Sequence, residues 1–420
     1  MYLRQVSWSS LYKFGSIVLN FYLVSLIVSL VGVEGYGVYT AAISVTTWMF
    51  LFDFGVAKGA RNVITKALIE KDFALIRKTV LITYTVTALV VLVMIGFFYF
   101  LVIYFDALKI EAIKNETLFI LLVTCVVYFL FSIVDQLNYA VHKGNLVFVN
   151  SFFVAFINVV LIKFFYQDVT VDDVVILFCL SKVAPYIFSS VYFFVVNIDF
   201  RVGFTVAFDW VLLKRILSNS IFIILIQLLF LLMIGLDRII LLNCSSGTEV
   251  AKYDILYRVM GVVMLPYSLL VSPLWATLKK VLEDKDWKKF TEIKYRFHLL
   301  LAVAVFLLVL VVISFDWIVG IWLTQSILID FYSKALMAVL FVCFIYCGFY
   351  TDMYFSFEVY KVLAFSLVLS LFLKYMYIYM SNEINAFAMI FSSVIGYMFL
   401  SVYFMMCNNS VSKGKFGTNL

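Results

Sequence analysis

Long unbroken apolar runs recur along the whole chain, and they restrict its fold more than any other feature. About twenty consecutive apolar residues are enough to cross the hydrocarbon core of a bilayer as a helix, and the 420-residue sequence contains about twelve such runs. Hydrophobic residues make up 65% of the chain and charged residues only 13%, against about 25% charged residues in soluble domains. The sequence therefore predicts an all-α integral membrane protein.

We predict twelve transmembrane helices joined by short connections. They lie near residues 12–32, 38–57, 79–104, 117–141, 146–166, 174–196, 219–243, 254–276, 297–323, 335–356, 362–380 and 386–406. The first run, residues 14–32, exceeds the apolar core of a signal peptide, about 7–15 residues, and lacks a small-x-small cleavage site. We expect it to remain as the first span.

The basic residues predict the orientation of these spans. With the N-terminus in the cytoplasm, 22 of the 31 Lys and Arg residues fall on the inner side, four lie in outer loops and five lie within spans. Loops rich in Lys and Arg stay on the cytoplasmic side. An even number of spans with both termini cytoplasmic follows. The net charge of +6 thus reflects membrane topology, and we expect no nucleic-acid partner.

An internal repeat predicts two lobes. The tripeptide GVE at 32–34 matches GTE at 247–249, and KDF at 71–73 matches KDW at 285–287 at almost the same separation along the chain. Both matches occupy the same places in the predicted topology. We therefore predict two pseudo-symmetric six-helix lobes, 1–200 and 219–420, with a cytoplasmic linker at 201–218. Because six spans are an even number, the lobes share one orientation and are expected to be related by an axis along the membrane normal.

The two loops that carry the second match have a further feature in common. Apolar residues recur at helical spacing among basic residues at 58–78 and at 279–296. This pattern is typical of basic amphipathic helices that lie on the inner leaflet. We expect them to anchor each lobe at the cytoplasmic surface.

The sequence lacks residues that several classes of protein require for their function. The six cysteines fall mostly inside spans, and neither histidine has a Cys or His at ligand spacing, so the sequence predicts no metal site, no disulfide framework and no cofactor. No G-x-x-x-x-G-K-[ST] phosphate loop occurs. A membrane glycosyltransferase or polymerase would need an acidic cluster or a large outer loop, and Asp172-Asp173 is the one adjacent acidic pair in an outer loop. We predict a transporter rather than an enzyme.

Two blocks of sequence resemble a known family. Residues 30–39 (LVGVEGYGVY), 51–56 (LFDFGV) and Arg61 resemble the N-terminal signature of the Wzx-type polysaccharide flippases, in the multidrug/oligosaccharidyl-lipid/polysaccharide exporter superfamily. The second half is similar to the family at 236–241 (LDRIIL), Gly247, Tyr253, 257–259 (YRV) and Pro273. Length and span count extend the resemblance over the whole chain.

This resemblance implies a function and partners. Such a protein turns undecaprenyl-pyrophosphate-linked oligosaccharide repeat units, of O-antigen or a related polysaccharide, from the cytoplasmic to the periplasmic leaflet of the inner membrane. The lipid-linked oligosaccharide and membrane lipids are the implied partners, with a polysaccharide polymerase and a chain-length regulator as further candidates. A cation-coupled drug exporter or a peptidoglycan-precursor flippase of the same superfamily is the alternative.

Charges inside spans are the candidate functional residues, because an intramembrane ion is costly and rare. Lys182 and Lys374 lie closest to mid-span, and with Arg258 and Arg238 they are the candidate cations for a lipid pyrophosphate. Asp135 is the candidate ion-coupling residue. Each has a structural alternative: ion pairs with carboxylates of other spans for the four cations, and a hydrogen bond between helices for Asp135.

Overall fold

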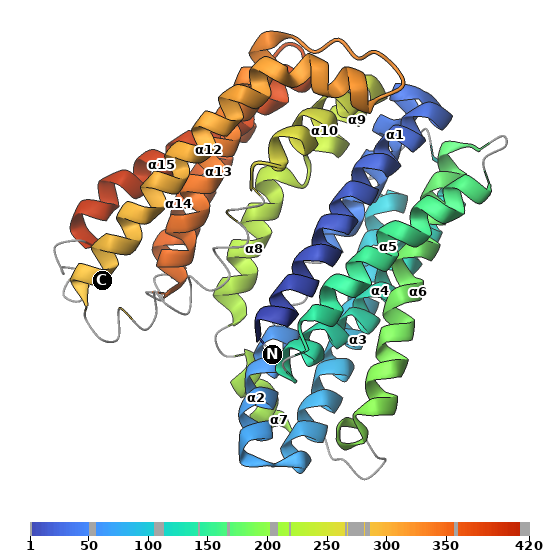
Figure 1. Cartoon of the computed structure of the whole chain (residues 1–420), viewed down its shortest axis with the longest axis vertical. Helices are drawn as coiled ribbons and strands as arrows, with labels where there is room; N and C mark the ends of the chain where they lie inside the picture. The colour runs from blue at the N-terminus through green and yellow to red at the C-terminus, as the bar shows by residue number, and fades with distance from the viewer. Residues whose placement is uncertain are drawn as a thin grey trace. The chain divides into compact units, whose positions relative to one another are not determined.

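The computed structural model describes residues 2–49, 56–104, 113–141, 143–165, 169–201, 209–217, 220–264, 267, 281, 286–356 and 360–411. Every regular element in these ranges is a helix (Figure 1). The helices are α1 (Tyr2–Met49), α2 (Val56–Glu70), α3 (Phe73–Tyr104), α4 (Asn115–Ala140), α5 (Asn145–Phe164), α6 (Val171–Val196), the 3-10 turn η2 (Ile198–Phe200), α7 (Trp210–Leu217), α8 (Ser220–Ile234), α9 (Asp237–Cys244), α10 (Gly247–Gly261), α12 (Trp287–Trp322), α13 (Phe331–Ser356), α14 (Tyr360–Met380) and α15 (Ala386–Val411). The predicted all-α membrane fold is confirmed.

Within the described ranges, ten helices are long and apolar enough to cross a membrane. Eight of the twelve predicted spans each coincide with one helix, α3 to α6 and α12 to α15. The seventh predicted span, 219–243, is divided into α8 and α9. The eighth, 254–276, overlaps the end of α10, and most of its remainder lies outside the described residues.

The first predicted span, 12–32, and the described part of the second, residues 38–49, both lie in α1. Its helical pattern is interrupted at Gly32, where φ is 73° and ψ is 177°. An L-residue with a side chain rarely adopts such a positive φ, whereas glycine does so at little cost. Gly32 therefore lets the chain change direction between the predicted spans 12–32 and 38–57. Asp53, at the inner end of the second predicted span, lies outside the described residues.

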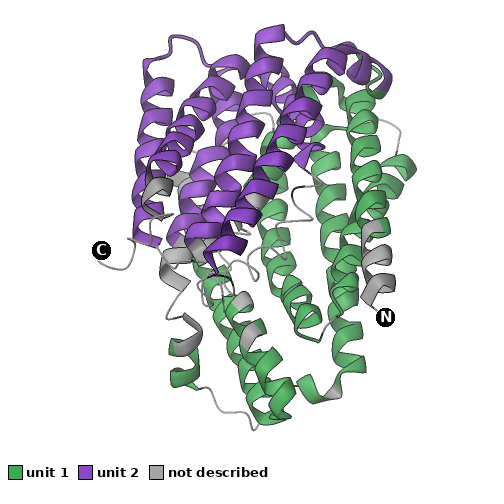
Figure 2. Ribbon diagram, turned by 60° about the vertical axis from the view of Figure 1, so that its left-hand side comes forward, with its two compact units in different colours: residues 1–224, 322–325 green, residues 225–321, 326–420 purple. Residues whose placement is uncertain are grey.

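The chain divides into two compact units (Figure 2). Unit 1 comprises residues 1–224 and 322–325, and unit 2 comprises residues 225–321 and 326–420. The division after residue 224 lies close to the predicted linker at 201–218. The predicted symmetry axis between the lobes stays a prediction.

Unit 1 is built from α1 to α7. α5 packs along α1 and α6, and α4 packs against α6. The helix expected within the basic loop 58–78 is α2, and it is amphipathic: Ile64 is fully buried against α3 and α4, whereas Ile69 is 79% exposed. Its apolar face thus joins the core of unit 1.

Unit 2 contains α8 from residue 225 onward and α9 to α15, except the last residue of α12. α15 packs against α13 and α14, and α10 packs against α13. One expectation is wrong here: the basic segment expected as a separate surface helix is, from Trp287 onward, the first part of α12, which continues without a break to Trp322. No Gly or Pro occurs in α12 before Gly320, so nothing in the sequence ends the helix at the membrane boundary.

Candidate functional site

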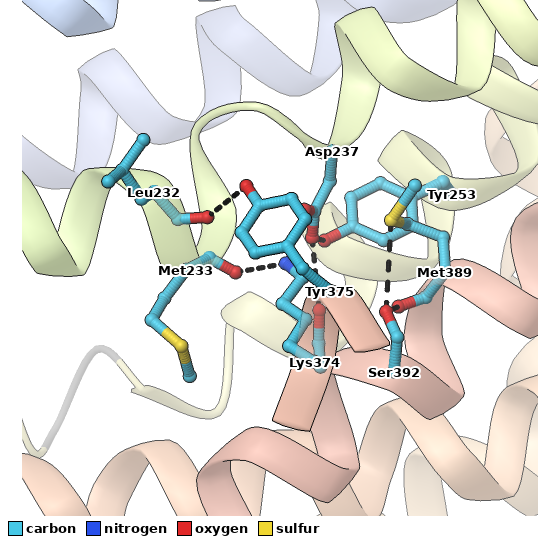
Figure 3. A network of polar contacts seen from close by, with 9 residues as sticks. Leu232, Met233, Asp237, Tyr253, Lys374, Tyr375, Met389 and Ser392 are labelled. Atoms are coloured by element: carbon cyan, nitrogen blue, oxygen red, sulfur yellow. Dashed lines mark hydrogen bonds and ion pairs between the residues drawn. The ribbon is translucent and has the colours of Figure 1, made fainter. Parts of the chain in front are cut away.

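A break in a membrane-spanning segment creates the most highly charged buried site in the described part of unit 2. α8 ends at Ile234 and α9 begins at Asp237. The last carbonyls of a helix lack partners within the helix. The Tyr375 hydroxyl donates to the Leu232 carbonyl at 2.8 Å, and the Lys374 ammonium donates to the Met233 carbonyl. Both donors come from α14 (Figure 3).

Lys374 lies between two helix ends of opposite polarity. Its Nζ is 2.5 Å from Oδ1 of Asp237, and both side chains are fully buried. Asp237 is the first residue of α9, where the helix dipole favours a negative charge. The ammonium of Lys374 contacts the C-terminal end of α8, where the dipole favours a positive charge. The helix break therefore stabilises both charges of this buried ion pair.

Two more side chains bind the Asp237 carboxylate. Oδ2 accepts a hydrogen bond from the Tyr253 hydroxyl of α10 at 2.8 Å and one from the Ser393 hydroxyl of α15 at 3.1 Å. Hydrogen bonds to an ionised group are worth about 1.5–3 kcal/mol each. Asp237 thus links four helices of unit 2: α9, α10, α14 and α15.

A second carboxylate binds the two predicted arginines. Arg238 donates to Oδ1 of Asp254 at 2.8 and 2.9 Å, and Arg258 donates to Oδ2 at 2.5 Å. The guanidinium of Arg238 also lies over the rings of Tyr253 and Tyr257, at 5.7 and 5.2 Å from their centroids. A cation over an aromatic face is attracted by the ring quadrupole.

The charges of these five residues do not cancel. Lys374, Arg238 and Arg258 supply three positive charges, and Asp237 and Asp254 supply two negative ones. The Asp254 side chain is 2% exposed, whereas those of Arg238 and Arg258 are 16% and 28% exposed. The network of these five residues therefore carries one formal positive charge in excess, and its arginines are the more accessible of its cations.

In unit 1, Asp135 joins three helices. It accepts a hydrogen bond from the Asn150 amide of α5 at 3.0 Å, and the same amide donates to the Ser189 hydroxyl of α6 at 3.1 Å. Asp135 itself lies on α4. The structural alternative for Asp135, a hydrogen bond between helices, is present, and its role in ion coupling stays a prediction.

Lys182, on α6, lies close enough to Asp135 to interact with it electrostatically. Its Nζ is 4.6 Å from the ring centroid of Tyr128 and 6.0 Å from that of Phe178. It also lines a small pocket with Thr46 and Thr124. Lys182 therefore belongs to unit 1, whereas the other three candidate cations belong to unit 2.

The structure identifies partners that sequence reasoning missed. It brings Lys374, Arg238 and Arg258 into one network, and their ion-pair alternatives are all present. The carbonyl of Met233 and the hydroxyl of Ser393 were not candidates. For the Met233 carbonyl, the signal in the sequence was Gly235, two residues before the charged pair Asp237-Arg238 inside an apolar run. For Ser393, one serine among many, there was no signal. No group of three or more His, Cys, Asp or Glu that could hold a metal occurs in the described ranges.

The helices and the buried charges define a multi-pass α-helical membrane protein, and its fold is that of MATE-family transporters. An inward-facing multidrug resistance MATE family transporter of the MOP superfamily has a TM-score of 0.75 with this chain, at 12% identity and with 96% of each chain covered. An outward-facing MATE family transporter has a TM-score of 0.64 at 15% identity, covering 99% of this chain and 96% of the other.

In sequence, the chain is similar to the "Putative O-antigen transporter" of Salmonella typhi, at 22% identity over 283 residues. The alignment covers 64% of this chain and 63% of the relative; the chain thus spans less than two thirds of that relative's length. No family model matches the sequence. These relatives are named as transporters and not as enzymes, and they confirm the resemblance seen in the sequence.

Proposed function

We propose that the protein is a flippase for lipid-linked polysaccharide repeat units in the bacterial cytoplasmic membrane. The substrate would be an undecaprenyl-pyrophosphate-linked oligosaccharide of O-antigen or a related surface polysaccharide. The name of the Salmonella typhi relative and the MATE transporter fold support this class of function. A polysaccharide polymerase and a chain-length regulator are the proposed protein partners.

The observation that carries the proposal is the excess positive charge in the five-residue network of unit 2. Three cations face two carboxylates among spans that are otherwise apolar. A pyrophosphate is a polyanion, and Arg binds phosphate oxygens through paired N–H groups. Arg238 and Arg258, which are partly exposed, would meet the pyrophosphate, and the fully buried Lys374 would hold the broken helix in place for them.

The broken helix also fits a transport cycle. In secondary transporters, substrate sites form where a membrane helix is discontinuous and its ends face the site. Alternating access would expose the network first to the cytoplasmic side and then to the periplasmic side, while the prenyl chain stays in lipid. Rearranging α8 against α9 would change the dihedral angles of the short segment between them and break a contact of Lys374, which binds the ends of both helices.

The experiment is complementation of a strain that lacks the gene. Deletion should abolish surface polysaccharide and accumulate undecaprenyl-linked units on the cytoplasmic face. Wild type should restore the polysaccharide, as should Lys66→Ala, whose side chain is 68% exposed, whereas Arg258→Ala should not at equal membrane expression. Lys182→Ala, Lys374→Ala and Arg238→Ala test the remaining three predicted cations. A deletion strain with normal polysaccharide would refute the proposal.

The second candidate function is a cation-coupled drug exporter. The partly buried Asp135 in unit 1, bound by Asn150, is the observation that favours it, because a carboxylate there could exchange a cation. Under this alternative the deletion strain would change in drug tolerance and not in polysaccharide, and Asp135→Asn would abolish the effect. A peptidoglycan-precursor flippase would instead make the deletion lethal or disturb cell-wall synthesis.

A further inference from the structure

Each unit contains an open pocket, and the two pockets lie at equivalent places in the predicted repeat. The pocket of unit 1 lies among α3, α4 and α6, the third, fourth and sixth predicted spans, and has a volume of about 380 Å³. The pocket of unit 2 lies among α12, α13 and α15, the ninth, tenth and twelfth predicted spans, and has a volume of about 430 Å³. Both volumes are within the range of ligand pockets, about 300–1,000 Å³.

The lining residues recur at nearly the spacing of the sequence repeat. Four lining residues of the unit 1 pocket can each be paired with one of the unit 2 pocket on the corresponding helix. The pairs on the first and second helices are separated along the chain by the same numbers of residues as the GVE and KDF matches. The separations of the two pairs on the third helix differ from this by only a few positions. The pairs are Tyr84 with His298, Phe131 with Tyr346, Ser190 with Ser401, and Phe194 with Met405. The pockets are therefore a duplicated feature of the chain and not two unrelated packing gaps.

The pocket of unit 1 combines an apolar wall with one cation. Val191 and Val195 line it and are more than half exposed. Arg201 lies just beyond the end of α6 and donates to the carbonyls of Phe194 at 2.7 Å and Val195 at 3.2 Å. A guanidinium has five N–H donors, so these two bonds fix its position and leave donors for an anion.

The Tyr84 hydroxyl adds a polar group to this wall. It is buried, lines the pocket and has no hydrogen-bond partner among the described residues. A buried hydroxyl without a partner costs free energy unless a ligand or water supplies one. An ester or phosphate oxygen in the pocket would accept this hydrogen bond.

The pocket of unit 2 also combines an apolar wall with basic side chains. Leu301, Val342 and Met405 supply apolar surface, and Lys294 and His298 supply the basic groups. Nδ1 of His298 is 2.7 Å from the Lys294 carbonyl one turn earlier, so this contact holds the imidazole in place and leaves Nε2 for a ligand. Both basic residues lie near the start of α12, next to the basic segment of the predicted cytoplasmic side.

We propose that the two pockets are binding sites for anionic phospholipid of the inner leaflet. One acyl chain would lie along the apolar wall, and the phosphate would bind Arg201 in unit 1 and Lys294 with His298 in unit 2. The net charge decides the occupant: a zwitterionic lipid matches the apolar wall equally well, but its ammonium group opposes the attraction of its phosphate to the protein's cations, whereas an anionic lipid has no such group. Negatively charged lipids are attracted to basic groups at this level of the membrane. The proposal does not depend on the identity of the transported substrate.

Native mass spectrometry of the full-length protein in detergent tests this proposal. Titration with phosphatidylglycerol should give two retained lipids per chain, and phosphatidylcholine should be retained less. Arg201→Gln and Lys294→Gln should each weaken one site about tenfold, the loss expected for a charge-assisted hydrogen bond. Arg296→Gln is the matched control, because Arg296 lies on the same helix as Lys294, is 73% exposed and pairs with Glu292.

Three outcomes of the titration with phospholipid would overturn the proposal. They are equal retention of both lipids by wild type, unchanged retention by the double variant R201Q/K294Q, and an equal loss in Arg296→Gln. Displacement of phosphatidylglycerol by undecaprenyl phosphate at low concentration would assign the pockets to the prenyl chain of a substrate and would also overturn it. Tyr84→Phe keeps the ring and should weaken only the unit 1 site, which separates ligand binding from misfolding.

Discussion

Replacing Lys374 by Met should destabilise unit 2 severely. The substitution keeps the length and apolar character of the side chain but removes the ammonium from a site where both charged groups are fully buried. Asp237 keeps its hydrogen bonds from Tyr253 and Ser393, but its charge loses the counter-ion. Removing one partner of a buried ion pair costs about 3–5 kcal/mol, because the remaining charge is uncompensated.

The double variant D237N/K374M separates this cost from any contact with substrate. With no net charge left in the pair, its free energy of unfolding should be closer to wild type than that of K374M. Unfolding in mixed detergent and SDS micelles measures the stabilities, and complementation of the deletion strain measures activity. Recovered stability without recovered polysaccharide would assign the Lys374–Asp237 pair a role in transport besides its structural one.

Two results would refute this reasoning. If K374M alone is as stable as wild type, the ion pair does not hold the broken helix. If the two single changes simply add in the double variant, the coupling energy is zero, whereas neighbouring charges are expected to couple by about 0.5–3 kcal/mol. Lys66→Met, at an exposed site of α2, should leave stability within about 0.5 kcal/mol of wild type.

Three further predictions follow from single sites. Asp254→Asn should cost about 3–5 kcal/mol in unfolding free energy, because it leaves two guanidinium groups without their shared counter-charge; an unchanged unfolding midpoint would contradict this. Gly32→Ala should lower stability by more than about 1 kcal/mol because of its positive φ, whereas Gly96→Ala, where an added Cβ meets nothing within 4 Å, should not. Although burial raises the pKa of Asp330, hydrogen bonds from Ser333 outweigh it and hold the pKa below its usual value. This stabilisation is therefore present above the unfolded-state pKa and lost as the pH falls through the folded-state pKa; Ser333→Ala should reduce the pH dependence of unfolding over that range.

Local patterns in the sequence determined the class of the protein. Runs of about twenty apolar residues predict membrane helices because a helix of that length satisfies its own backbone hydrogen bonds in lipid. For this reason, eight predicted spans each coincide with one helix of the structure. The motif residues around Gly32 and Tyr253 also pointed to the superfamily to which the structural relatives belong.

The same patterns could not show the interruptions in helices. The run 219–243 reads as one span because its residues are apolar on both sides of the break at 235–236. The break is stabilised by donors from α14, a helix far from it in the sequence. A helix boundary that depends on a distant hydrogen-bond donor leaves little trace in the local sequence.

By itself, the sequence determined which residues are charged within the membrane; the tertiary structure decided what each of them binds. An intramembrane charge is visible in any apolar run because of its cost, so Lys374 and Arg238 could be singled out in advance. The partners of these cations depend on how the helices pack. Lys374 binds Asp237, which lies 137 residues away in the chain. Arg238, the residue after Asp237, instead binds Asp254. Adjacent residues of a helix face different directions, so only the folded chain could distribute these cations between the two carboxylates, Asp237 and Asp254.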